Sequence, residues 1–168
     1  MQRNTGQPYD ADGAWAASGQ TIERLLDTLL AHPFFAAAPP KSCGREQFNI
    51  DWLESSLDGR RRAEDVQRTL LELTAASVAA AITRWCGLPD ELVVCGGGAH
   101  NHSLMKRLQE YLPQTGVLTS DLLGIEPDWV EAMAFAWLAR QTLLGRAGNL
   151  PAVTGARGAR VLGAIYPG

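Results

Sequence analysis

The sequence contains few cysteines, three among 168 residues. Cys43, Cys86 and Cys95 are odd in number and widely spaced, and no two of them form a Cys-x-x-Cys pair. A disulfide framework and a zinc knuckle both need closer and more regular spacing, so neither is expected. Unpaired thiols are typical of a reducing compartment, and we expect the protein in the cytoplasm.

The sequence also lacks long apolar runs and an excess of positive charge. No stretch reaches the roughly 20 apolar residues of a membrane-spanning helix, and the N-terminus has no apolar signal-peptide core. The formal net charge is −3, and basic residues are scattered apart from Arg60, Arg61 and Arg62. We therefore expect neither a membrane nor a nucleic acid as partner.

What is present is the composition of an ordinary globular domain. Apolar residues make up 46% of the chain, which is enough for one domain over residues 1–168 with its own core. Helical spacing of apolar positions predicts helices over residues 20–32, with Ser18 as N-cap, and over residues 63–85. Residues 127–145 have an almost entirely apolar interior, which predicts a helix buried on more than one side.

The remaining segments carry weaker signals. Residues 1–18 show no sustained period and are predicted to be irregular. Residues 33–57 contain the Pro39-Pro40 pair, which predicts a loop that closes with a short helical turn near residues 51–57. The C-terminal stretch "RVLGAIY", residues 160–166, is predicted to be a strand.

A β-α-β unit is predicted between these parts. The apolar run "ELVVCGGG" ends in glycine and indicates a buried strand, "NHSLMKRLQEYL" indicates an amphipathic helix, and "GVLTSD" a second strand. The fold class is therefore α/β, with a short sheet flanked by helices.

Three consecutive glycines, Gly96, Gly97 and Gly98, join the first strand to this helix. Bare backbone at a helix N-terminus lets an anion such as a phosphate approach the N–H groups, which predicts nucleotide binding. The dinucleotide fingerprint G-x-G-x-x-G fails at its third place, where Asn101 stands. Asp121 ends the next predicted strand, where a ribose-binding acid belongs, so a dinucleotide site stays as an alternative.

Polar residues near the turn have more than one interpretation. Asn101 is suited to cap the helix or to offer its amide to a nucleotide. His100 and His102 lie close to Cys95, but no further ligands accompany them, so no metal site is expected.

Further candidates lie elsewhere in the chain. Glu131, one turn inside the apolar helix, needs a protein or hydroxylated partner if its face is buried. Lys41 and Arg45 are possible anion or sugar contacts in a charged loop. No residue qualifies as a general base on local grounds.

Six segments together resemble one family, in the family's order: "YDADGAWAASG", "PPKSCGREQFN", "LTAASVAAAI", "VVCGGGAHN", "LGIEPDWVEAMAFAWLA" and "GNLPAVTGARGARVLGAIYPG". They closely resemble the C-terminal half of anhydro-N-acetylmuramic acid kinase. The resemblance implies the second lobe of an actin, hexokinase and Hsp70 type of ATPase fold. It also implies a kinase of peptidoglycan recycling and amino sugar catabolism that uses ATP, Mg²⁺ and water to convert the 1,6-anhydro sugar to N-acetylmuramic acid 6-phosphate.

The resemblance also assigns residues. Gly96, Gly97 and Gly98 match the family's nucleotide-binding turn, with Asn101 beside it, and Glu131 matches a sugar-contacting acid. The family's "GTSxDG" and "DTGPGN" segments, the second with the catalytic base, do not occur here, so no catalytic residue is assigned to this chain.

A chain without those segments is expected to be inactive alone, because phosphoryl transfer needs both walls of the cleft. The missing N-terminal half is then its expected partner. We also expect an exposed apolar face, marginal stability and possible homodimerisation. A non-catalytic nucleotide- or sugar-binding remnant is the alternative.

Overall fold

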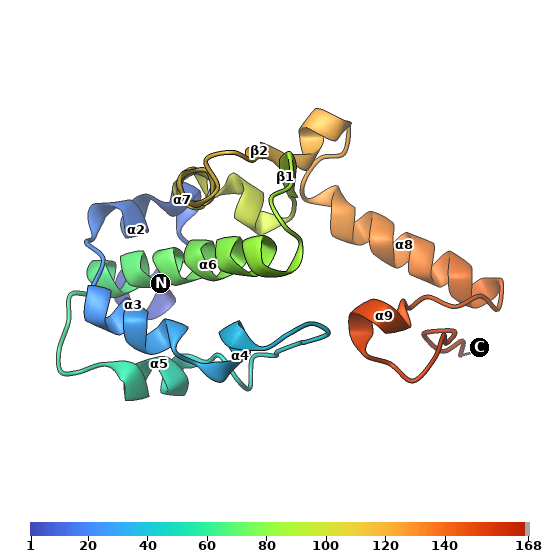
Figure 1. The fold of residues 1–168 in the computed structure, drawn as a ribbon, viewed down its shortest axis with the longest axis horizontal. Helices are drawn as coiled ribbons and strands as arrows, with labels where there is room; N and C mark the ends of the chain where they lie inside the picture. Colours follow the sequence, from blue (N-terminus) through green and yellow to red (C-terminus); the bar gives the residue numbers. More distant parts are fainter. Residues whose placement is uncertain (167–168) are drawn as a thin grey trace.

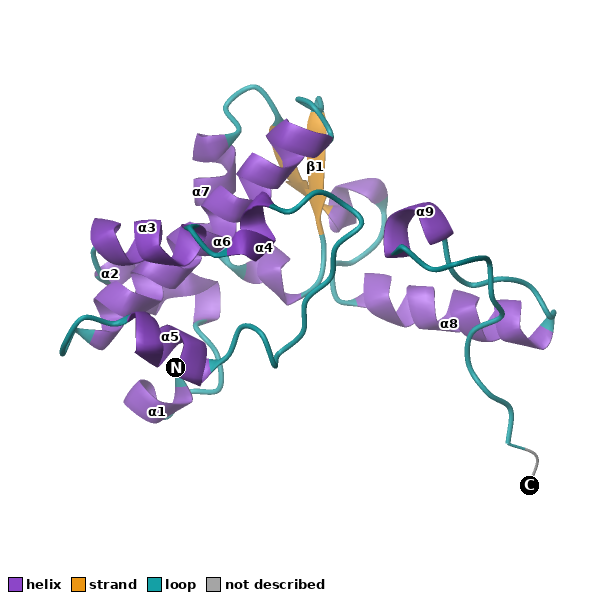
Figure 2. Cartoon of the chain, turned by 60° about the horizontal axis from the view of Figure 1, so that its bottom comes forward, coloured by secondary structure: helices purple, strands orange, loops and turns teal. Residues whose placement is uncertain are grey.

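The computed structural model describes residues 1–166; the last two residues of the C-terminal segment quoted above lie outside this range. The fold is mixed α/β, with many helices around a two-stranded parallel sheet, as expected. Figure 1 shows two parts: the helices up to α7 gather with the sheet, whereas α8, α9 and the C-terminus extend to one side. Figure 2 shows the same separation from a second direction.

The longest helix, α6 (Ala63–Trp85), runs through the larger part of the molecule. It coincides with the predicted helix over residues 63–85. Helices α2, α3 and α7 pack against it. Its buried side chains include Leu73 and the small residues Ala75 and Ala79, which let neighbouring helices approach closely.

The first 18 residues are helical apart from Met1 and residues 6–10, so the prediction of an irregular segment was wrong for most of its length. They form α1 (Gln2–Thr5), the 3-10 helix η1 (Ala11–Gly13) and α2 (Ala14–Ser18). The Asp10 carboxylate accepts hydrogen bonds from the backbone N–H groups of Trp15 and Ala16, at 2.8 and 2.9 Å. Ala16 is fully buried. The Asp10 carboxylate and packing against α6 therefore stabilise α2. Neither contact produces a hydrophobic period in the sequence.

The predicted helix over residues 20–32 is shorter, α3 (Glu23–Leu30), and Ser18 does not cap it. Ile22 is its N-cap residue, and the Ile22 N–H donates instead to Thr69 Oγ1 of α6 at 2.9 Å. The main apolar cluster joins the two helices through Leu25, Leu26, Leu29 and Leu73.

The following loop contains two short helices, α4 (Pro33–Ala36) and α5 (Ile50–Ser56). The second confirms the predicted helical turn near residues 51–57. Pro33 begins α4 instead of only ending the helix before it.

The predicted β-α-β unit is confirmed, but its first strand is not buried as predicted. Strands β1 (Glu91–Val94) and β2 (Gly116–Thr119) pair in parallel, with Val94 opposite Thr119. The residues of β1 alternate between exposed and half-buried, because the sheet has only two strands and leaves β1 uncovered on one side. The 3-10 helix η2 (Gly97–His100) and α7 (His102–Tyr111) connect them, and η3 (Ser120–Leu123) follows β2. The glycines therefore lie at the carboxyl edge of the sheet.

A buried carboxylate joins α6 to α7. Glu72 is only 2% exposed, and its Oε1 lies 2.7 Å from both Arg68 Nη2 and Arg107 Nε. Tyr111 also donates its hydroxyl to Glu72, at 3.2 Å. Burial alone lowers the pKa of the Arg107 guanidinium, but the hydrogen bond and the charge of Glu72 outweigh it and raise this pKa.

Helix α8 (Trp129–Leu143) forms where it was predicted, but it is exposed instead of buried on more than one side. Phe135 and Leu143 are 63% and 74% exposed. The expected exposed apolar face is thus confirmed. It consists of these α8 side chains: Trp129, Met133, Phe135, Trp137 and Leu143.

The chain ends with α9 (Pro151–Thr154) and irregular backbone. The predicted strand over residues 160–166 is absent, so that prediction was wrong. A strand needs a neighbour for its N–H and C=O groups, and this segment bonds instead to nearby loop residues. The Arg160 N–H, for example, donates to Asn149 Oδ1 at 2.7 Å.

Candidate functional site

The glycine turn, residues 96–98, has the shape that its sequence predicts. Gly96 adopts φ 69° and ψ −169°, a combination that essentially only glycine reaches. The Ala99 N–H donates to Gly96 O and the Asn101 N–H to Gly98 O, which closes η2 directly before α7. Backbone N–H groups thus gather at the positive end of a ten-residue helix.

The space over the glycine turn is open. A Cβ added at Gly96 or Gly97 would meet no atom within 4 Å, and one at Gly98 would meet only Leu104 Cδ2 at 3.7 Å. The packing of the described chain therefore does not explain the bare backbone at Gly97 and Gly98. An approaching ligand group does, because it needs the space that a side chain would fill.

Asn101 caps α7, as one of its two interpretations predicted. Its Oδ1 accepts a hydrogen bond from the Leu104 N–H at 2.9 Å. The same oxygen is therefore already in use, and the side-chain amide nitrogen is the group that Asn101 has left for a ligand.

The glycine turn is tied to the start of α8. The Gly96 N–H donates to Pro127 O at 3.0 Å, and His100 Nε2 lies 2.9 Å from Asp128 Oδ1. Glu131 lies in the first turn of α8 and is exposed, so its carboxylate can be solvated by water and does not need a protein hydrogen-bond partner. The structure thus places the glycine turn, Asn101 and the helix start that carries Glu131 in one region.

Lys41 and Arg45 do not join this region through any hydrogen bond within residues 1–166. The Lys41 ammonium donates to Phe34 O and Phe35 O, at 2.8 and 3.2 Å, and lies 4.7 Å from the centre of the Phe34 ring. It satisfies the last carbonyls of α4, which is a structural role. Arg45 is exposed.

Two features were missed by sequence reasoning. Ser120, the first residue of η3 directly after β2, is 6% exposed, and its hydroxyl has no hydrogen-bond partner among residues 1–166. Its position near the end of the predicted strand "GVLTSD" was the only signal. Asp121, the acid of the dinucleotide alternative, follows it and is exposed.

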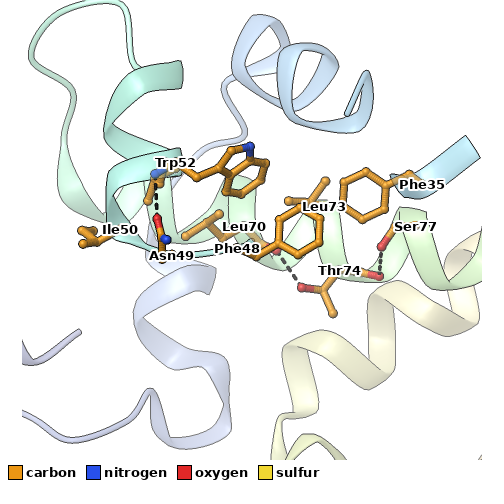
Figure 3. A pocket seen from close by; sticks show the side chains of 10 residues that line it. Phe35, Phe48, Asn49, Ile50, Trp52, Leu70, Leu73, Thr74 and Ser77 are labelled. Atoms are coloured by element: carbon orange, nitrogen blue, oxygen red, sulfur yellow. Dashed lines mark hydrogen bonds between the residues drawn. The ribbon is translucent and has the colours of Figure 1, made fainter. Parts of the chain in front are cut away.

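The second feature is an aromatic cavity of about 470 Å³ between α5 and α6. Figure 3 shows Phe35, Phe48 and Trp52 along its wall. Its polar side chains bond to nearby backbone: Thr74 donates to Leu70 O and Ser77 to Thr74 O. No charged side chain lines it, so it offers no group for phosphoryl transfer.

Within residues 1–166, no group of three His, Cys, Asp or Glu side chains is arranged to hold a metal ion. None of the helices there combines the length and apolar character that a membrane crossing requires.

Comparisons with known proteins identify relatives over the whole chain. The profile of the family described as anhydro-N-acetylmuramic acid kinase matches residues 1–168. The anhydro-N-acetylmuramic acid kinase of Thiobacillus denitrificans is 56% identical over 170 residues, which cover 99% of this chain and 46% of that protein. Proteins with the same description from Nitrosospira multiformis and Pseudomonas putida are 55% and 54% identical, over 98% and 99% of this chain. The chain spans about half the length of these curated relatives.

Proposed function

Because the chain belongs to the anhydro-N-acetylmuramic acid kinase family, we propose that it forms one wall of such a kinase's active site. The reaction is the ATP-dependent conversion of 1,6-anhydro-N-acetylmuramic acid, with water, to N-acetylmuramic acid 6-phosphate. It belongs to peptidoglycan recycling and is assigned to the cytoplasm. The chain itself corresponds to part of the second lobe of an actin-like ATPase fold.

The open glycine turn is the observation that carries this proposal. Gly97 and Gly98 leave the backbone open at the carboxyl edge of a parallel sheet and directly before α7, whereas the Gly96 N–H is already bonded to Pro127 O. Ligands of open α/β sheets bind at this edge, and phosphates bind at helix N-termini. We assign the phosphates of ATP to this turn.

Two side chains complete the assignment. The Asn101 amide nitrogen is placed to donate to a nucleotide oxygen while its Oδ1 caps α7. Glu131 is assigned to accept hydrogen bonds from sugar hydroxyls, and its exposure leaves it accessible. Lys41 and Arg45 stay outside this assignment because Lys41 is bonded to the end of α4.

Mg²⁺ enters with ATP in this reaction, where it neutralises phosphate charge. The described residues offer no cluster of ligands that fits the ion.

A complementary polypeptide is required in this proposal. No described residue of the site is placed as a base for water, and phosphoryl transfer needs charge stabilisation around the transferred group. The partner that we propose is a polypeptide matching the part of the curated relatives that this chain does not span.

Reconstitution tests the proposal. We expect ATP-dependent phosphorylation of the anhydro sugar when this chain is mixed with the remaining part of the Thiobacillus denitrificans kinase, and almost none with either alone. Gly97→Val abolishes nucleotide binding with the fold intact, because the added side chain fills open space. Glu131→Ala lowers turnover at limiting sugar, whereas Asp27→Ala, an exposed acid of α3, does not.

The outcomes separate the candidate functions. Full activity of the lone chain contradicts the need for a partner. Nucleotide binding by an inactive mixture indicates a binding remnant instead. Binding of a nicotinamide dinucleotide revives the dinucleotide alternative, which has little support because Asn101 occupies the place of the third glycine and caps α7.

A further inference from the structure

A turn near the N-terminus touches the start of α7, although about 90 residues separate them along the chain. This turn, residues 12–13, is called the Asp12–Gly13 turn. Ser103 Oγ donates to Gly13 O at 3.1 Å, and His102 Nδ1 lies 3.1 Å from Asp12 Oδ1. Both contacts reach the first turn of α7, directly after the glycine turn.

Position 13 needs glycine because the start of α7 lies too close to leave room for a side chain. An added Cβ would lie 2.2 Å from Asn101 Oδ1 and 2.7 Å from Ser103 Cβ. Asn101 Oδ1 is held by the Leu104 N–H, and Ser103 Cβ is attached directly to the helix backbone. A rotation of one side chain therefore cannot relieve the clash. Either Asn101 leaves its cap or the first turn of α7 moves.

The backbone of the turn is held in an uncommon conformation. Asp12 has φ 57° and Gly13 has φ 68°, and Asp12 is the only non-glycine residue within residues 1–166 with a positive φ. Such conformations persist where the surroundings determine them, and they gather at functional sites. Here the Asp10 carboxylate holds one side of the turn, through Trp15 and Ala16, and α7 holds the other.

We propose that the Asp12–Gly13 turn is a positioning element for the glycine turn at residues 96–98. It fixes the first turn of α7, and η2 connects that turn directly to Gly96 through the bonds from Ala99 and Asn101. The Asp12–Gly13 turn thereby sets the direction in which the N–H groups of Gly97 and Gly98 point. The Asp12–Gly13 turn touches no nucleotide itself, and the inference rests on the nucleotide role proposed above.

Amide resonances of the complete chain test the proposal by nuclear magnetic resonance. Gly13→Ala shifts the resonances of residues 96–104 and weakens MgATP binding about tenfold, because hydrogen bonds weaken steeply with misalignment. Gly59→Ala is the matched control, since Gly59 has φ 83° but open space around it. It carries the same left-handed strain and leaves both the resonances and the affinity unchanged.

Ser103→Ala provides a milder variant that folds without a clash. It removes only the bond to Gly13 O, so it shifts the same resonances and weakens MgATP binding by a smaller factor. The unfolding midpoint in urea is measured for every variant, and affinities are compared for the folded protein.

The proposal is overturned if Gly13→Ala and Ser103→Ala lower stability but keep the wild-type affinity, because the turn is then only structural. It is also overturned if the resonances of residues 96–104 do not move. Absence of any MgATP shift in the wild-type chain contradicts the nucleotide role instead. The resonances measured without nucleotide still decide whether the Asp12–Gly13 turn fixes the glycine turn.

Discussion

At the scale of single residues, the buried Glu72 carboxylate has the largest consequences. Its partners come from two helices, Arg68 of α6 and Arg107 of α7, and both arginines are partly exposed. Removing one member of a buried ion pair leaves its partners without compensation, whereas exposed pairs contribute little. This one side chain therefore adds an ionic link to the packing of α7 on α6.

Glu72→Gln is expected to lower the free energy of unfolding by about 2 kcal/mol, because two guanidinium groups lose their shared carboxylate. The loss stays moderate because both arginines can reach water. Urea unfolding measures it. Lys106→Gln, an exposed change on α7, is the control and is expected to stay within about 0.5 kcal/mol of wild type. Equal effects of the two variants would contradict the role of Glu72.

At the scale of elements, the cap of α7 serves both the helix and the proposed site. Asn101 and Asn49 are matched N-caps: each accepts a hydrogen bond from the N–H three residues later, at 2.9 Å. Only Asn101 adjoins the glycine turn. Comparing the two separates the stability of a helix from the binding of a ligand.

Asn101→Ala and Asn49→Ala are each expected to lower the free energy of unfolding by about 1 kcal/mol. Only Asn101→Ala also weakens MgATP binding. Asn101→Asp keeps the cap, so stability is nearly unchanged, but its negative charge repels phosphate. Urea unfolding and nucleotide titration measure the two effects. Weaker nucleotide binding by Asn49→Ala would show that helix stability alone explains the change.

The elements differ in how much of them was predictable. Local periodicity was sufficient for α6 and for the β-α-β unit, because both carry their apolar pattern within one segment. Helix α2, within the first 18 residues, depends on the Asp10 carboxylate and on packing against α6, contacts that no local pattern shows. The strand predicted over residues 160–166 has the composition of a strand but no neighbour to pair with.

The candidate site was predictable in part for the same reason. Three glycines between a strand and a helix mark a turn of this kind, so the glycine turn and the Asn101 cap followed from the sequence. The Asp12–Gly13 contact did not, because it joins segments about 90 residues apart. The burial of Ser120 likewise depends on the assembled sheet.

At the scale of the whole molecule, the apolar face of α8 is the dominant feature. Trp129, Phe135 and Leu143 are all more than half exposed. The apolar composition of the helix predicted burial, but the C-terminal residues 162–165, which lie beside Phe135 and Leu143, leave both side chains largely exposed. Contiguous apolar patches of this kind favour association with another surface.

A Phe135→Glu and Leu143→Glu double variant is expected to reduce the fluorescence of a bound hydrophobic dye by about half or more, and to reduce self-association. Unfolding free energy changes by less than about 0.5 kcal/mol per site, because both side chains are exposed. Leu88→Glu, an exposed leucine in a separate loop, is the control. Dye fluorescence and sedimentation measure the result. A wild-type chain that is monomeric, unfolds cooperatively and binds no dye would contradict this prediction.

The hydrogen bond from the Gly96 N–H to Pro127 O attaches the start of α8 to the glycine turn, while the far end of the helix lies away from it. The helix starts two residues after Pro127, and at 1.5 Å per residue its 15 residues extend about 22 Å from that point. If α8 tilts by about 10° at Pro127, its far end at Leu143 moves by about 4 Å. The position of Leu143 therefore depends strongly on the angle at which α8 leaves the glycine turn.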